Sequence, residues 1–139
     1  MLILDTNHYR EIAEESVIGA RLVQRLRDSG DECFLTVVTA QEVLKGWLAQ
    51  IQPHHQRDRG VSAYHDFQDS LEGISKWFLL PWTDDAADIF DSLRGRKVNI
   101  GAMDLRIASI ALEYNATVLT RNFADFKKVP GLRVENWLD

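Results

Sequence analysis

Short runs of apolar residues alternate along this chain with longer amphipathic stretches, and this alternation limits the folds that it can adopt. The runs with the length of a strand are residues 2–4, 33–38, 78–80 and 117–119, with residues 132–134 as a candidate fifth. Strands that are apolar throughout and separated by helices are typical of a parallel sheet with helices on both faces. We therefore expect an α/β fold with a mostly parallel central sheet.

Apolar residues at intervals of three and four predict the helices between these strands. The amphipathic stretches are residues 17–26, 39–51, 61–78, 86–93 and 107–114. Pro53 is expected to end the second stretch, and the polar segment 54–60 to connect it to the third. Asp5-Thr6-Asn7, directly after the first strand, suits a turn or a helix start.

Length and composition exclude several classes of protein. A chain of 139 residues with 45% apolar residues is one domain, residues 1–139, with a real core. Sixteen basic against 21 acidic residues give a net charge of -5, which argues against nucleic-acid binding by bulk charge but not against a nuclease that recruits metal ions. A single cysteine excludes a disulfide framework and a cysteine-based zinc site. No run suits a signal peptide or a membrane helix, so we expect a cytoplasmic protein that makes no membrane contact.

Acidic residues stand where the predicted strands end. Right-handed crossovers bring the carboxyl ends of parallel strands to one edge of the sheet, where open α/β sheets bind their ligands. The acidic residues at or after these ends are Asp5, Glu42, Asp104 and Asp125. We therefore expect four carboxylates to converge on one site.

Each of the first two acids also has a structural alternative. Asp5 precedes a candidate helix, where Asp is a common N-cap. Thr39 and Glu42 have the spacing of a capping box, with Thr39 as the N-cap. A capping role does not exclude a ligand role, because a first-turn Glu lies beside the end of the strand.

Asp104 gives a sharper signal. It lies three and four residues before Ile107 and Ala108, so its side chain is expected on the apolar face of a helix. A carboxylate there is costly unless it is paired or bound to a metal. The alternative is a partly exposed Asp in the first helical turn. Asp125 follows the fourth strand, with Thr120 and Asn122 as supporting neighbours.

A divalent cation would relieve the repulsion among such acids. Carboxylates a few ångströms apart raise one another's pKa values. Mg²⁺ and Mn²⁺ prefer oxygen ligands, whereas zinc favours histidine and cysteine, which are absent from these positions. We expect Mg²⁺, with Mn²⁺ able to substitute for it.

These residues, in this order and spacing, resemble the PIN domain, and within it the small prokaryotic toxin ribonucleases called VapC. The resemblance rests on Asp5-Thr6-Asn7, Glu42, the segment 101–108, Thr120-Arg121-Asn122, and the tail 129–134 with Trp137. It implies a single three-layer α/β/α sandwich, PIN-like over residues 1–139, with an acidic Mg²⁺ site that cleaves RNA. It also implies a homodimer and a small antitoxin partner.

Carried over by position, the resemblance makes Asp5, Glu42 and Asp104 the metal ligands and leaves the fourth position to Asp125 or Asn122. Thr6, Asn7, Thr120 and Asn122 become supporting residues. The hypothesis is hydrolysis of RNA by metal-activated water, which leaves 5′-phosphate and 3′-hydroxyl ends.

Several cations are candidates for holding the RNA backbone. Arg94, Arg96 and Lys97 precede the Asp104 helix, and Arg121 follows the fourth strand. The alternative for the first three is a solvated helix end. His54, His55 and His65 are expected to be surface residues rather than a metal cluster.

Two other functions compete with the nuclease. One is a catalytically silent PIN-like module that binds RNA or protein. The other is a phosphate-handling enzyme such as a phosphatase or receiver domain, which needs an adjacent acidic pair that Asp5-Thr6-Asn7 lacks. No Gly-rich phosphate loop is present, which disfavours nucleotide binding.

Overall fold

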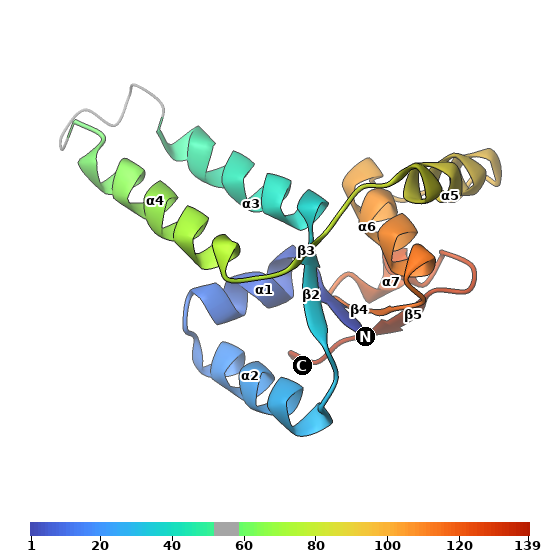
Figure 1. The fold of residues 1–139 in the computed structure, drawn as a ribbon, viewed down its shortest axis with the longest axis horizontal. Helices are drawn as coiled ribbons and strands as arrows, with labels where there is room; N and C mark the ends of the chain where they lie inside the picture. The colour runs from blue at the N-terminus through green and yellow to red at the C-terminus, as the bar shows by residue number, and fades with distance from the viewer. Residues whose placement is uncertain (52–58) are drawn as a thin grey trace.

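The strands form one five-stranded sheet in the computed structural model, which describes residues 1–51 and 59–139. They are β1 (Leu2–Leu4), β2 (Cys33–Thr36), β3 (Leu79–Leu80), β4 (Thr117–Leu119) and β5 (Arg133–Glu135). Their order is β3-β2-β1-β4-β5, and every neighbouring pair is parallel (Figure 1). The predicted parallel sheet is confirmed.

Helices connect the strands. They are α1 (Thr6–Ala13), α2 (Val17–Ser29), α3 (Val37–Gln50), α4 (Val61–Ser75), α5 (Asp84–Gly95), α6 (Ala102–Glu113) and α7 (Phe123–Phe126). The sequence analysis did not predict α1 as a full helix, because α1 buries His8 and Tyr9 instead of aliphatic residues. It missed α7, which has only four residues.

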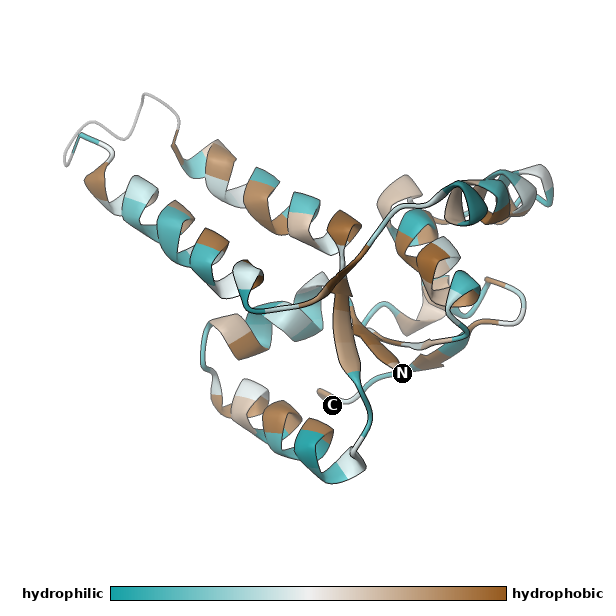
Figure 2. Cartoon of the chain, viewed as in Figure 1, coloured by the Kyte–Doolittle hydropathy of each residue, from teal (hydrophilic) through white to brown (hydrophobic). Residues whose placement is uncertain are grey.

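Two apolar cores lie on opposite faces of the sheet. Ile3 and Val118 pack with α5, α6 and α7 on one face. Leu2, Leu4 and Leu119 pack with α1, α3 and α4 on the other. Figure 2 shows the strands as mostly apolar and the surrounding helices as striped. This alternation gives the expected three-layer α/β/α sandwich, because successive strand residues point to opposite faces.

The start of α3 corrects the expected capping box. Its N-cap is Thr36, whose Oγ1 accepts a hydrogen bond from the Thr39 N–H at 3.0 Å, so Thr39 is not the cap. The strand expected to reach residue 38 ends at Thr36, opposite the last residue of β3. Glu42 is therefore in the second turn of α3, where it has no capping role to perform.

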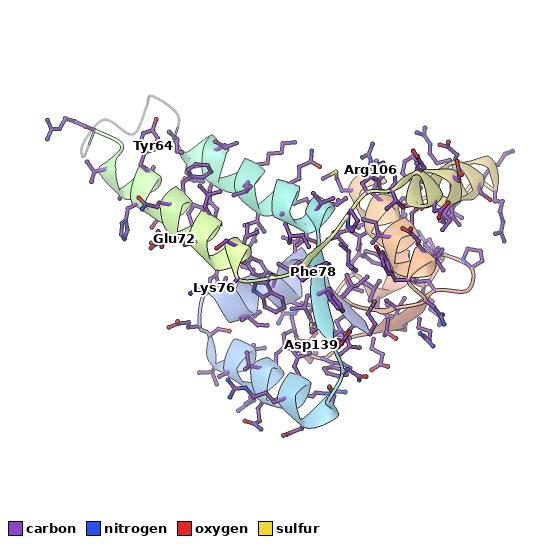
Figure 3. The ribbon with its side chains drawn as sticks, in the orientation of Figure 1. Tyr64, Glu72, Lys76, Phe78, Arg106 and Asp139 are labelled. Atoms are coloured by element: carbon purple, nitrogen blue, oxygen red, sulfur yellow. The ribbon has the colours of Figure 1, made fainter. Side chains whose placement is uncertain are left out.

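The α3 and α4 helices run side by side as an arm away from the sheet, with Tyr64 near its tip (Figures 1 and 3). The predicted third helix is shorter than expected, because α4 ends at Ser75 and Phe78 is 68% exposed. The expectations for Pro53 and for His54 and His55 concern residues outside the described parts of the chain. No helix within those parts is long and apolar enough to cross a membrane.

Candidate active site

The parallel topology places several chain segments at one edge of the sheet. Asp5 directly follows β1, Thr120 directly follows β4, and α3 begins at the last residue of β2. The tail after β5 leaves the sheet at this edge too, because β5 pairs in parallel with β4. Residues distant in sequence therefore meet at this edge.

Asp5 is buried, and both of its carboxylate oxygens accept hydrogen bonds. It is the N-cap of α1, and its Oδ1 accepts the His8 main-chain N–H at 3.0 Å. Its Oδ2 accepts the hydroxyl of Thr120, from the end of β4. The capping alternative is confirmed for Asp5, but capping uses only one of the two carboxylate oxygens.

Glu42 lies on α3, where partial burial and the other acids raise the pKa of its carboxyl. Its Oε1 accepts the Thr6 hydroxyl at 3.3 Å. Burial raises the pKa of this carboxyl most, and the negative charges of Asp104 and Asp5 raise it further, against smaller opposing effects of Thr6 and Arg10. The pKa of Glu42 is therefore affected by two acids that are distant in sequence.

Asp104 lies in the first turn of α6 and is also partly buried. Burial raises the pKa of its carboxyl most, and the charges of Asp5 and Asp125 add to this. The Asn122 side-chain amide donates to Oδ2 at 2.9 Å, which favours the charged form. Asp104 is therefore the partly exposed first-turn Asp that the sequence left as the alternative, with its carboxylate only partly removed from water.

Asp125 occupies the outer side of the group. The same Asn122 amide nitrogen donates to its Oδ2 at 3.1 Å, and the Lys128 ammonium lies 3.2 Å from its Oδ1. These two contacts lower the pKa of the Asp125 carboxyl below its usual value, with the Asn122 bond contributing most. Asn122 thus links Asp104 to Asp125.

The four predicted acids are therefore electrostatically coupled at the edge of the sheet. All their donor atoms are carboxylate oxygens, which suit a hard divalent cation. Within residues 1–51 and 59–139, however, no three His, Cys, Asp or Glu side chains are close enough together to hold one ion. Binding would require the side chains to draw together, which their mutual repulsion opposes in the absence of a cation.

The other predicted residues differ in their positions. Thr6 and Thr120 each contact one of the acids and Asn122 contacts two, whereas Asn7 is exposed. Arg121 is engaged elsewhere: its guanidinium lies 3.2 Å from a carboxylate oxygen of Glu11 and 3.6 Å from one of Asp139. Its side chain holds the C-terminal end of the chain against α1.

The basic cluster lies at the end of α5. Arg94, Arg96 and Lys97 are exposed at the C-terminal end of α5, which runs toward the periphery in Figure 1. The Arg94 guanidinium lies 5.6 Å from the ring centroid of Phe90. This position agrees with the solvated helix end that the sequence left open. His65 is exposed beside Asp69, 3.3 Å away, as expected for a surface histidine.

The sequence analysis missed one buried polar residue at the site. His8 is fully buried, and its ring nitrogen Nδ1 lies 3.3 Å from Oδ1 of Asp5. The spacing of three residues after a helix N-cap is the signal that could have revealed this contact. It was missed because α1 was not predicted as a full helix.

The raised pKa values predict how the stability of the metal-free protein depends on pH. Glu42 and Asp104 bind protons more tightly in the folded than in the unfolded chain. Their contribution to stability is fully present below their unfolded pKa values and is lost as the pH rises through the folded ones. In EDTA, we expect the melting temperature to rise as the pH falls from 7.5 to 5.

The double variant Glu42→Gln/Asp104→Asn isolates this contribution, because its two amides do not titrate. Its melting temperature should change less with pH than that of the wild type over the same range. Parallel curves for the two proteins would show that the two carboxyls titrate as they do in the unfolded chain.

Comparison with known proteins identifies the family. The sequence pattern of the PIN domain matches residues 2–132. The chain is 53% identical over 102 residues to "Ribonuclease VapC2" of Rickettsia felis, and 29% identical over 109 residues to "Ribonuclease VapC" of Rickettsia bellii. These matches cover 73% and 75% of this chain, and 75% of each relative.

The fold is similar to a solved structure described as VapBC2 from Rickettsia felis bound to a DNA fragment from their promoter. The TM-score is 0.74 at 21% identity, with 98% of both chains covered. The chain belongs to the PIN-domain family, and its predicted resemblance to the VapC-type members is confirmed.

Proposed function

We propose that this chain is a Mg²⁺-dependent endoribonuclease, the toxin of a type II toxin–antitoxin pair. It hydrolyses RNA phosphodiester bonds, is neutralised by a cognate antitoxin protein, forms a homodimer and acts in the cytoplasm. The relatives named as VapC ribonucleases support an RNA-cleaving hydrolase.

One observation supports a catalytic centre above the others. Four acids from separate segments are coupled through their charges, and Glu42 and Asp104 have raised pKa values partly because of that coupling. A fold that served only as a scaffold would gain stability by losing these charges. Retaining them is explained if a cation is bound there during function.

The residues have separate proposed roles. Asp5, Glu42 and Asp104 hold the ion, and Asp125 completes the site from its outer side. Asn122 orients Asp104 and Asp125 through its amide. When bound, Mg²⁺ supplies Lewis acidity, which activates water and neutralises charge on the phosphate. Thr6 and Thr120 restrain Glu42 and Asp5 through their hydroxyls.

The substrate backbone needs positive charge. Arg94, Arg96 and Lys97 are exposed and form no ion pair with another described residue, so they are the proposed contacts to RNA. Arg121 is a weaker candidate because two carboxylates already neutralise it.

Cleavage of RNA by the purified protein tests this function. In the presence of Mg²⁺ or Mn²⁺ we expect defined fragments with 5′-phosphate and 3′-hydroxyl ends, because attack by water does not use the RNA 2′-hydroxyl. EDTA should abolish cleavage, and restored Mg²⁺ should recover it. End-specific ligation and labelling of the fragments distinguish the products; 2′,3′-cyclic phosphate ends would contradict the mechanism.

The alternative is a catalytically silent PIN-like module that binds RNA or protein. The net charge of -5 and the open arrangement of the acids are the observations that favour it. The same assay separates the two functions. Binding of RNA without metal-dependent cleavage, under conditions in which a known nuclease is active, would establish the module.

A further inference from the structure

His8 is a buried histidine to which the proposed mechanism assigns no role. Its ring is fully buried at the start of α1. Both ring nitrogens have partners: Nδ1 lies 3.3 Å from Oδ1 of Asp5, and Nε2 accepts the main-chain N–H of Trp137 at 3.2 Å. The ring therefore lies between an acid of the candidate active site and the C-terminal tail.

The contact with the tail defines which nitrogen of His8 carries the proton. A nitrogen that accepts a hydrogen bond has its lone pair free, so Nε2 is unprotonated. The proton of the neutral ring is then on Nδ1, which donates it to Oδ1 of Asp5. The main-chain N–H of Trp137 thus selects the tautomer that can hold Asp5.

The tail is itself held by several contacts. The Arg25 guanidinium of α2 lies 4.2 Å from the ring centroid of Trp137, and the Trp137 indole N–H donates to Glu135 at 2.6 Å. Arg121 reaches the end of the chain at Asp139, which is labelled in Figure 3. These contacts fix the position of the Trp137 main chain relative to α1 and α2.

Asp5 is left with a restricted set of free lone pairs. A carboxylate offers about four acceptor positions. The His8 main-chain N–H and the His8 ring use Oδ1, and the Thr120 hydroxyl uses one position on Oδ2. The carboxylate is therefore fixed in rotation, with an acceptor position remaining on Oδ2.

We propose that His8 is a positioning residue that orients the Asp5 carboxylate for a divalent cation, with the Trp137 main-chain N–H fixing its tautomer. This inference rests on the proposed function. Partners that orient a metal-binding carboxylate typically change metal affinity by about 10- to 100-fold when they are removed.

Two amide variants separate the orientation of Asp5 from simple packing. The Asn side chain of His8→Asn places an amide nitrogen near the position of Nδ1, so it keeps the donor to Asp5 and loses the acceptor for Trp137. The Gln side chain of His8→Gln places its amide near Nε2, so it keeps the acceptor and loses the donor. Mn²⁺ affinity is measured by calorimetry on the metal-free proteins, alongside urea unfolding.

We expect His8→Gln to weaken Mn²⁺ binding by about 10- to 100-fold, and His8→Asn to bind within a few-fold of the wild type. Both variants are expected to be less stable than the wild type. Equal affinities in the two variants, or affinities that simply follow their stabilities, would overturn the proposal. If the wild type cleaves RNA with metal while the expected difference between His8→Gln and His8→Asn is absent, only the role of His8 is wrong. If the wild type neither binds Mn²⁺ nor cleaves RNA, the proposed function is wrong, and the inference about His8 is wrong with it.

A measurement without metal tests the tautomer directly. In nitrogen-15 spectra of the histidine-labelled wild type, His8 should show a protonated Nδ1 and an unprotonated Nε2. The opposite assignment would also overturn the proposal, because an unprotonated Nδ1 cannot donate to Asp5.

Discussion

Replacing Asp104 by asparagine is expected to lower metal-dependent RNA cleavage by more than about 100-fold, above the range typical of residues that only orient a ligand. The same change should leave the melting temperature in EDTA unchanged or higher at pH 7.5. The reason is that burial and the charges of Asp5 and Asp125 disfavour the Asp104 carboxylate. An asparagine can still accept the Asn122 amide through its side-chain oxygen.

Asp85→Asn is the matched control for this variant. Asp85 also lies in the first turn of a helix, α5, but is exposed. The start of α5 lies beside the end of α6, because Thr83 donates to Glu113, whereas Asp104 is at the opposite end of α6. The Asp85→Asn change removes a favourable interaction with a helix dipole, about 0.3–1 kcal/mol, as Asp104→Asn does. Cleavage should persist in Asp85→Asn. Equal cleavage by the wild type and Asp104→Asn would place the activity at another site or in a contaminant.

Replacing Gly19 by alanine is expected to lower the melting temperature by about 5–15 °C. The added Cβ would lie 2.0 Å from the carbonyl oxygen of Glu11, where the start of α2 packs against α1. Backbone atoms cannot rotate away, so the two helices must separate. Overpacking of this kind costs about 1–3 kcal/mol or more, and each kcal/mol shifts the melting temperature of a domain of this size by several degrees.

Gly46→Ala, also inside a helix, is expected to raise the melting temperature instead of lowering it. Gly46 is inside α3, and a Cβ there would meet no atom within 4 Å. Alanine should therefore stabilise the protein by about 0.5–1 kcal/mol through helix propensity. Thermal unfolding followed by circular dichroism measures both variants. Similar shifts in the two would mean that α1 and α2 do not approach as closely as the structure shows.

Much of the architecture could be predicted from local patterns. The apolar runs at residues 2–4 and 117–119 match β1 and β4, because strands buried on both faces have no polar positions. The boundary between β2 and α3 could not be predicted in the same way. Both Thr36 and Thr39 suit an N-cap, and the pairing of Thr36 with Leu80 of β3 decides between them.

For the candidate site too, part could be predicted from the sequence and part could not. The sequence by itself determined which acids follow the strands, because the parallel order follows from the pattern of strands and helices. It did not determine how each side chain is held. The bond from Thr120 to Asp5, the bridge of Asn122 between Asp104 and Asp125, and the pairing of Arg121 join segments distant in sequence. Local propensity carries no information about such contacts.

The chain sequence thus determined the order of the elements and the acidic character of one edge of the sheet. Only the tertiary structure decided that His8 and the C-terminal tail belong to that edge. The physical reason is that β5 pairs with β4 in parallel, so the tail leaves the sheet beside α1 and its Trp137 N–H reaches the imidazole. Hydrogen-bond partners across 129 positions depend on how the strands assemble.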